Sequence, residues 1–294
     1  MRVIVLFPGA LGDLCLLAPA LRASITDGAH LTLSVQRALG PIAALLVPEA
    51  EIGPPIDGAF FATLFADAPD PELLGWLRGA DRVHAWLARG DRDGRVDAVL
   101  RSSGVALAWH AVPRDDDDER HAGDDYAFAL GLRGATTAVG AHAPVASERA
   151  LPWRVPEARR VLLHPGSGGR HKRWDPRGFA LVVDALRAAG RQPALLLGPA
   201  EHGEAPAWRR AGVAVVDGLD LVAAAALIAS APVWIGNDSG MSHLAGALGR
   251  RGVVVFAATR AARWCPRGGA LVPVETAGRA LDDVAREVCA RALA

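Results

Sequence analysis

The sequence predicts an α/β protein that folds as two domains, each with a parallel sheet. The chain has 294 residues, which suits two domains of about 150 residues each. Strand-like and helix-like stretches alternate along it, and one glycine turn occurs twice. The turn is LFPGALGD at residues 6–13 and LHPGSGGR at residues 163–170. We therefore expect two Rossmann-like domains, over residues 1–150 and 151–294.

The N-terminal half opens with a βαβ pattern. Residues 2–7, RVIVLF, are rich in branched apolar side chains and predict a strand. The first glycine turn then leads into an apolar helix over residues 14–24, and residues 31–35 predict a second strand. Strands joined by helices form parallel sheets, so this half should begin with a parallel pair.

The C-terminal half repeats the alternation. Strands are expected at residues 160–164, 193–198, 213–217, 233–237 and 253–257, and helices at 176–190, from Leu219 and from Ser239. A segment rich in proline and polar residues, 143–159, is the expected linker between the domains. The charged run at 114–120 has no periodicity and is expected to be a solvated loop.

Composition and charge narrow the class of protein. Three cysteines are too few for a disulfide framework or a zinc site, and no signal peptide or membrane span is recognisable, which favours a soluble, cytoplasmic protein. The formal net charge is zero, but residues 1–150 carry about −7 and residues 151–294 about +7. An anionic ligand is therefore expected on the C-terminal half, and no nucleic-acid partner is expected.

The second glycine turn has the composition of a phosphate site. In HPGSGGRHKRW, residues 164–174, a strand ends in small residues whose N–H groups can bind an anion beside the following helix. The chain has 32 lysines and arginines together, and Lys172 is the only lysine. Lysine is a compact point charge suited to a phosphate oxygen. The spacing matches neither a Walker loop nor a GxGxxG site, and a flexible turn is the alternative interpretation.

A second anion site is predicted within VWIGNDSGMSHLAGALG, residues 233–249. A strand ends there, and Asn237, Asp238 or Ser239 can cap the next helix, while Gly240 allows a ligand to approach the backbone. His243 lies about one turn into that helix. The alternatives are that His243 only packs and that Asp238 only caps.

Asp13 ends the first glycine turn and is a candidate general base, with a helix N-cap as its alternative role. The DRD at residues 91–93 follows no strand, so we interpret it as a surface turn, and we expect no metal site.

Together, these stretches resemble the ADP-heptose:lipopolysaccharide heptosyltransferase family, glycosyltransferase family 9. The matching segments are the LGD that ends at Asp13, residues 164–174, residues 236–243, and FAATRAARWCPRG at 256–268. In the last segment, Ala257 and Ala258 replace the Gly-Pro that is usual in the family.

The resemblance implies a GT-B fold, in which two Rossmann-like domains face each other across a cleft. It implies an inverting, metal-independent transfer from a nucleoside-diphosphate sugar, with heptose as a candidate sugar and an ADP-sugar as a candidate donor. The catalytic base falls on Asp13. The donor contacts fall on Ser167, Gly168, Lys172, Glu201, Asp238, Ser239, Gly240, Met241 and His243.

Two other functions stay open at this stage: a nucleotide-sugar hydrolase or epimerase, and a non-catalytic nucleotide-sugar binding protein. The expected acceptor is a carbohydrate or glycoconjugate, which suggests lipopolysaccharide or glycoconjugate biosynthesis and peripheral contact with the inner face of the membrane. However, a first half near −7 is a poor electrostatic match for a heavily phosphorylated lipid core.

Overall fold

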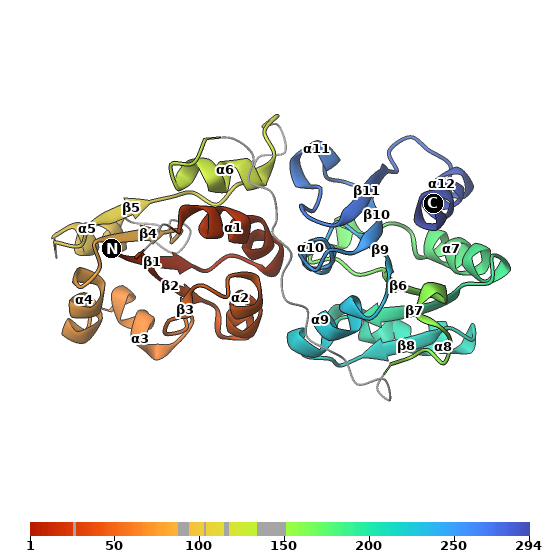
Figure 1. Ribbon diagram of the computed structural model, residues 1–294, viewed down its shortest axis with the longest axis horizontal. Coiled ribbons are helices and arrows are strands. Elements are labelled where there is room, and N and C mark those ends of the chain that lie inside the picture. Colours follow the sequence, from red (N-terminus) through yellow and green to blue (C-terminus); the bar gives the residue numbers. More distant parts are fainter. Residues whose placement is uncertain (26–27, 67, 88–93, 103, 115–117, 134–150) are drawn as a thin grey trace. The chain divides into compact units, whose positions relative to one another are not determined.

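The computed structural model describes residues 1–294 except 26–27, 67, 88–93, 103, 115–117 and 134–150 (Figure 1). The chain divides into two compact units. The first unit holds the described residues up to Arg114 and those from Gly123 to 133. The second holds the described residues 118–122 and those from 151 onward.

The first unit contains a parallel sheet of five strands in the order β3-β2-β1-β4-β5. The chain first builds β1, β2 and β3 in one direction and then returns to place β4 on the other side of β1. This creates a topological switch point between β1 and β4, where ligands bind in open α/β sheets. The strands are β1 (Arg2–Phe7), β2 (His30–Val35), β3 (Glu51–Ile52), β4 (Arg82–Ala85) and β5 (Leu107–Trp109).

Helices cover both faces of the first sheet because its strands alternate buried side chains between the two faces. Ile4 and Leu6 pack in one core cluster with side chains of α3, α4 and α5, whereas Phe7 contacts Tyr126 of α6. The helices are α1 (Leu11–Ser24), α2 (Gly40–Leu46), α3 (Ala59–Ala62), α4 (Pro71–Arg78), α5 (Arg95–Ser102) and α6 (Ala122–Ala129). α1 begins three residues earlier than the sequence predicted.

The second unit contains a parallel sheet of six strands in the order β11-β10-β9-β6-β7-β8. The switch point lies between β6 and β9, because β7 and β8 extend the sheet to one side and β10 and β11 to the other. The strands are β6 (Arg160–His164), β7 (Gln192–Leu197), β8 (Ala214–Asp217), β9 (Val233–Asn237), β10 (Arg251–Phe256) and β11 (Ala270–Glu275).

Helices also cover both faces of the second sheet, with α7 and α12 on one face and α9 and α10 on the other (Figure 1). Phe179 of α7 and Val288 of α12 share a core cluster with Leu163 and Ile235 of the central strands. The helices are α7 (Pro176–Ala188), α8 (Ala205–Arg210), α9 (Leu221–Ala229), α10 (Gly240–Ala247), α11 (Ala261–Trp264) and α12 (Leu281–Leu293).

Gly252 allows β10 to lie against β9. Its φ is +137°, and a Cβ atom built on it would lie 1.9 Å from the backbone oxygen of Trp234. Any larger residue would therefore have to push the two central strands apart.

The two parallel sheets confirm the predicted α/β class with two Rossmann-like domains. Residues 118–122 group with the second unit, whereas the predicted division into domains at residues 1–150 and 151–294 stays a prediction. The physical reason for this grouping is a pair of hydrogen bonds, from Arg263 to the Arg120 carbonyl (2.7 Å) and from the His121 ring to the Cys265 carbonyl (2.7 Å). The predicted boundary at residue 150 adjoins a segment outside the described residues and stays a prediction. Within the described part of the chain, no helix meets the length and apolarity that a membrane crossing requires.

Candidate functional site

Two stretches that the sequence singled out separately converge in the second unit. β6 and β9 are parallel neighbours, so the turns that follow them emerge at the same edge of the sheet. The Ser167 hydroxyl donates to the backbone oxygen of Asp238 (2.7 Å), and the Lys172 Nζ donates to Asp238 Oδ2 (3.0 Å). The two turns that the sequence predicts to bind an anion therefore lie together at the switch point of this sheet.

Asn237 fixes the two turns to each other. Its side chain is fully buried; Nδ2 donates to the Pro165 carbonyl (2.6 Å), and Oδ1 accepts from the Trp174 backbone N–H (3.1 Å). The sequence predicts for Asn237 only a role as a candidate helix cap. Its signal in the sequence is an amide at the end of a strand, a side chain that can satisfy one donor and one acceptor at once.

Asp238 is the anchor of this site. Its Oδ2 accepts hydrogen bonds from Lys172 and from the Thr259 hydroxyl (2.6 Å). The Asp238 side chain is 4% exposed and that of Lys172 is 31% exposed. The carboxylate is therefore buried, whereas the ammonium group is accessible to a ligand. Thr259 belongs to the segment at 256–268 that the family resemblance included, although the sequence did not single this residue out.

α10 begins directly behind Asp238. Its N-cap is Ser239, whose hydroxyl accepts from the Ser242 N–H (3.3 Å), so the capping role proposed for Asp238 is wrong. Gly240 and Met241 are the first two residues of the helix, where N–H groups have no partner within the helix. This end of a helix has positive polarity and favours anions.

His243 is a neutral group with unused hydrogen-bonding capacity. Burial lowers its pKa to about 4, although Asp238 opposes the shift; His121 and Lys172 reinforce it. Its Nε2 lies 3.8 Å from Asp238 Oδ1, and its buried Nδ1 has no hydrogen-bond partner among the described residues. At neutral pH the imidazole can therefore donate or accept a hydrogen bond but adds no charge to the site.

Glu201 and Gly168 differ in their surroundings. Glu201 is buried, its Oε2 accepts from the Gly198 N–H (3.2 Å), and a Cβ at Gly166 would come within 2.5 Å of the same oxygen. Gly166 is therefore required for close packing of the turn on this carboxylate. A Cβ at Gly168 would meet nothing within 4 Å, so the backbone there is open.

In the first unit, Asp13 lies in the first turn of α1, next to the carboxyl end of β1. Its Oδ1 accepts a hydrogen bond from the hydroxyl of Tyr126 (2.9 Å). The N-cap of α1 is Ala10, which has no side-chain cap, so the alternative role of Asp13 as a cap is wrong. The charge of Asp13 also helps to raise the pKa of the buried Cys15 thiol, for which burial is the main cause.

An aromatic cluster holds Tyr126 in place. Its ring lies 5.9 Å from that of Phe7 and 6.2 Å from that of Trp86, and Phe7 and Trp86 are 5.8 Å apart, measured between ring centroids. The contacts of Phe7 with Tyr126 and Trp86 are edge-to-face, a geometry that fixes ring orientation, and the Trp86 and Tyr126 rings are tilted by 55°. Tyr126 belongs to none of the motifs recognised in the sequence, although it is the only tyrosine of the chain.

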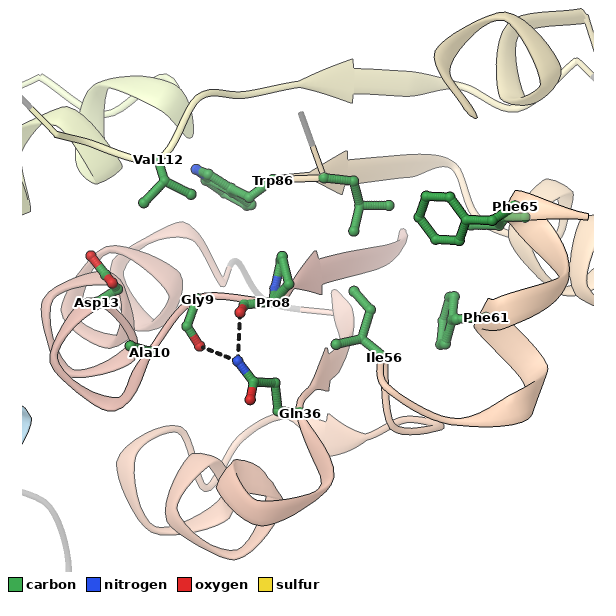
Figure 2. A pocket seen from close by; sticks show the side chains of 12 residues that line it. Pro8, Gly9, Ala10, Asp13, Gln36, Ile56, Phe61, Phe65, Trp86 and Val112 are labelled. Carbon is green, nitrogen blue, oxygen red and sulfur yellow. Dashed lines mark hydrogen bonds between the residues drawn. The ribbon is translucent and has the colours of Figure 1, made fainter. Parts of the chain in front are cut away.

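A pocket of about 430 Å³ opens beside Asp13 at the switch point of the first sheet (Figure 2). Gln36 closes one side by donating to the carbonyls of Pro8 (2.7 Å) and Gly9 (3.3 Å). The described residues that line the pocket are Pro8, Gly9, Ala10, Asp13, Gln36, Ile56, Phe61, Leu64, Phe65, Trp86, Leu87 and Val112.

In the described part of the chain, no three His, Cys, Asp or Glu side chains are grouped so that they could hold a metal ion. The DRD at 91–93 lies outside the described residues.

Solved structures with the same fold were found by comparison. ADP-heptose LPS heptosyltransferase II of E. coli is 18% identical, with a TM-score of 0.73 over 100% of this chain and 99% of its own. E. coli heptosyltransferase WaaC, solved with ADP, is 18% identical, with a TM-score of 0.70 over 98% of both chains. A glycosyl transferase family 9 protein of Veillonella parvula is 20% identical, with a TM-score of 0.71 over 94% of this chain and 86% of its own.

A comparison with curated protein sequences gives no match. The family model of glycosyltransferase family 9 (heptosyltransferase) matches residues 131–284, just over half of the chain. This match includes both turns that converge on Asp238. The chain therefore belongs to glycosyltransferase family 9, and it is a glycosyltransferase.

Proposed function

We propose that this glycosyltransferase moves a sugar from a nucleoside-diphosphate sugar to an acceptor hydroxyl, with inversion at the anomeric carbon and without a metal ion. The observation that carries the proposal is the convergence of Ser167 and Lys172 on Asp238 at the switch point of the second unit. The structure of WaaC with ADP and that with ADP-2-deoxy-2-fluoro heptose support an ADP-heptose as the first donor to test.

In this proposal, the second unit binds the diphosphate of the donor. The open backbone at Gly168 and the first N–H groups of α10 donate to phosphate oxygens. Lys172 has three N–H donors, so it can keep its bond to Asp238 and still donate to a phosphate. Charge on the leaving diphosphate is thereby neutralised by the protein.

Asp13 is proposed as the general base. The acceptor hydroxyl gives its proton to the Asp13 carboxylate as its oxygen forms the new bond to the anomeric carbon. The bond from that carbon to the diphosphate breaks, and the diphosphate leaves with the electron pair. A single displacement of this kind inverts the configuration, and the hydrogen bond from Tyr126 holds the carboxylate in one orientation.

The remaining predicted donor contacts have distinct proposed tasks. Asp238 positions Lys172, and the neutral His243 offers a hydrogen bond to the sugar or the diphosphate. Ser239, Gly240 and Met241 form the anion-binding start of α10. Glu201 remains a candidate contact of the nucleoside, besides its packing against Gly166.

The test is an assay in which the whole chain consumes ADP-heptose in the presence and absence of a panel of hydroxyl acceptors. ADP binding to the same protein is measured by calorimetry. Asp13→Asn should leave ADP affinity unchanged and lower the transfer rate by about 10² to 10⁴, because an amide cannot accept the proton. Asp220→Asn, at an exposed carboxylate of another helix, is the matched control. A chelator should leave turnover intact.

Three outcomes would contradict the proposal. Equal donor loss with and without acceptor would indicate a hydrolase. Full transfer activity in Asp13→Asn would exclude Asp13 as the general base. Strict dependence of the activity on a divalent cation would exclude Lys172 as the charge that neutralises the diphosphate.

A further inference from the structure

The pocket beside Asp13 is apolar over most of its length. Of its twelve described lining residues, Asp13 alone has an ionisable side chain, and the lining includes three aromatic rings, those of Phe61, Phe65 and Trp86. Figure 2 shows Asp13 at one end and Phe61 and Phe65 at the other. Among the described residues, the lining therefore has one ionisable end, at Asp13, and a long apolar end.

The nearest histidines do not change this polarity. His84 and His110 hydrogen-bond to each other (2.8 Å, Nδ1 to Nε2), and the ring of His110 lies 4.5 Å from that of Trp86. Burial lowers the pKa of His84 to about 4 and also lowers that of His110. Both imidazoles are therefore uncharged at neutral pH and provide no cation for a phosphorylated ligand.

The polar groups at the Asp13 end suit a hydroxyl compound. Trp86 Nε1 is buried and has no hydrogen-bond partner among the described residues, and Figure 2 shows it on the side of the ring toward Asp13. A carboxylate and a neutral N–H can pair with a hydroxyl as acceptor and donor, whereas a phosphate beside the carboxylate would be repelled. The volume of about 430 Å³ is typical of a small-molecule site.

We propose that this pocket selects the acceptor: it binds an uncharged, ring-bearing hydroxyl compound, with the ring among Phe61, Phe65 and Ile56 and the hydroxyl toward Asp13. Burial of the ring supplies the affinity, because apolar surface removed from water is stabilising. A phosphorylated glycolipid core would find no cation in the described lining. This inference rests on the proposed function, since it takes Asp13 as the base.

Three glycosides test the polarity of the pocket on the full-length protein without nucleotide. Phenyl β-D-glucoside has the neutral ring, methyl β-D-glucoside lacks it, and 4-carboxyphenyl β-D-glucoside adds one negative charge. Calorimetry or ligand-observed NMR should show that the phenyl glycoside binds at least tenfold more tightly than either of the others. Equal affinity for the methyl glycoside, or tighter binding of the carboxylate, would overturn the inference.

Phe65 can be replaced without disturbing the packing of the core, because its side chain is 51% exposed. Phe65→Ala should weaken binding of the phenyl glycoside about three- to tenfold, and Phe65→Arg should reverse the preference in favour of the carboxyphenyl glycoside. Phe128→Ala is the matched control, since Phe128 is 72% exposed and does not line the pocket. An unchanged preference in both Phe65 variants would show that the glycosides bind elsewhere.

The two levels of proposal can fail separately. ADP titrated into the same variants should bind with unchanged affinity. If ring selectivity holds but no acceptor is ever glycosylated, the proposed function fails and the pocket remains a binding site. If transfer occurs but a phosphorylated acceptor is preferred to a neutral one, the inference fails and the proposed function stands.

Discussion

The ammonium group of Lys172 is partly exposed and is held in place by its hydrogen bond to the buried Asp238 carboxylate. Arginine at this position would keep the charge, but its wider, planar group would pair with Asp238 through two N–H donors and direct fewer toward a ligand. We expect Lys172→Arg to weaken ADP binding about tenfold in a calorimetric titration.

Arg170→Lys is the control for this substitution, because Arg170 is exposed in the same short segment. It should leave ADP affinity unchanged. Wild-type affinity in Lys172→Arg would mean that the single lysine has no specific role in donor binding.

Tyr126 offers a test of how Asp13 is held. Tyr126→Phe removes one hydroxyl and keeps the ring contacts with Phe7 and Trp86. A hydrogen bond to a charged group contributes about 1.5–3 kcal/mol, so loss of orientation should lower kcat about tenfold or more. Steady-state kinetics should show an unchanged KM for the donor. A matching fall in both kcat and melting temperature with a raised KM would instead indicate general loosening of the fold.

Site residues that belong to a local sequence pattern could be predicted from the sequence. Those whose role depends on hydrogen bonds to distant segments could not. Asp13 stands out in its glycine turn, but its partner Tyr126 is 113 residues away. Asn237 and Thr259 were missed as site residues for the same reason, since each is defined by bonds to distant turns. The alternative role of Asp13 as the cap of α1 is wrong: aspartate is a frequent cap, but Ala10 occupies that position.

At the scale of elements, the N-terminus of α10 combines two roles that a pair of variants can separate. Ser239 caps α10, and Asp220 caps α9 by accepting from the Ala223 N–H (2.7 Å). Replacement of either cap by alanine should lower the free energy of unfolding by about 0.5–2 kcal/mol. Only Ser239→Ala should also weaken ADP binding. Equal ADP affinity in the two variants would reduce Ser239 to a cap.

The order of the strands explains what the sequence could and could not predict about elements. Alternating strands and helices predicted two parallel sheets, and the start of α9 was misplaced by only two residues because Asp220 caps it. The pairing of β6 with β9 could not be predicted from chain order, since β7 and β8 separate them in sequence. That pairing brings the two predicted anion sites together at one edge of the sheet.

For the molecule as a whole, three buried histidines predict a loss of stability in mild acid. The pKa of His84, His164 and His243 is lowered to about 4 in each case, mainly by burial. In the unfolded chain the same groups titrate near their ordinary value of about 6.5. Between these values the unfolded state binds more protons, so the free energy of unfolding falls as pH decreases from about 6.5 to 4.

The expected loss between pH 7 and pH 5 is up to about 2 kcal/mol for each histidine. Urea unfolding followed by tryptophan fluorescence at the two pH values measures it, with return to pH 7 as the check for reversibility. Both units should be affected, since His84 belongs to the first and the other two to the second. Equal midpoints at pH 7 and pH 5 would show that folding does not lower the pKa of these histidines.

The scarcity of two residue types has a practical consequence. The chain contains one tyrosine, Tyr126, and one lysine, Lys172, and they lie in different units, hydrogen-bonded to Asp13 and Asp238 respectively. Isotope labelling of tyrosine and lysine alone would therefore yield one NMR signal for each, without any mutation. The tyrosine signal would report on Asp13 beside the proposed acceptor pocket and the lysine signal on the proposed donor site, so the order in which the two proposed substrates bind could be followed in the native protein.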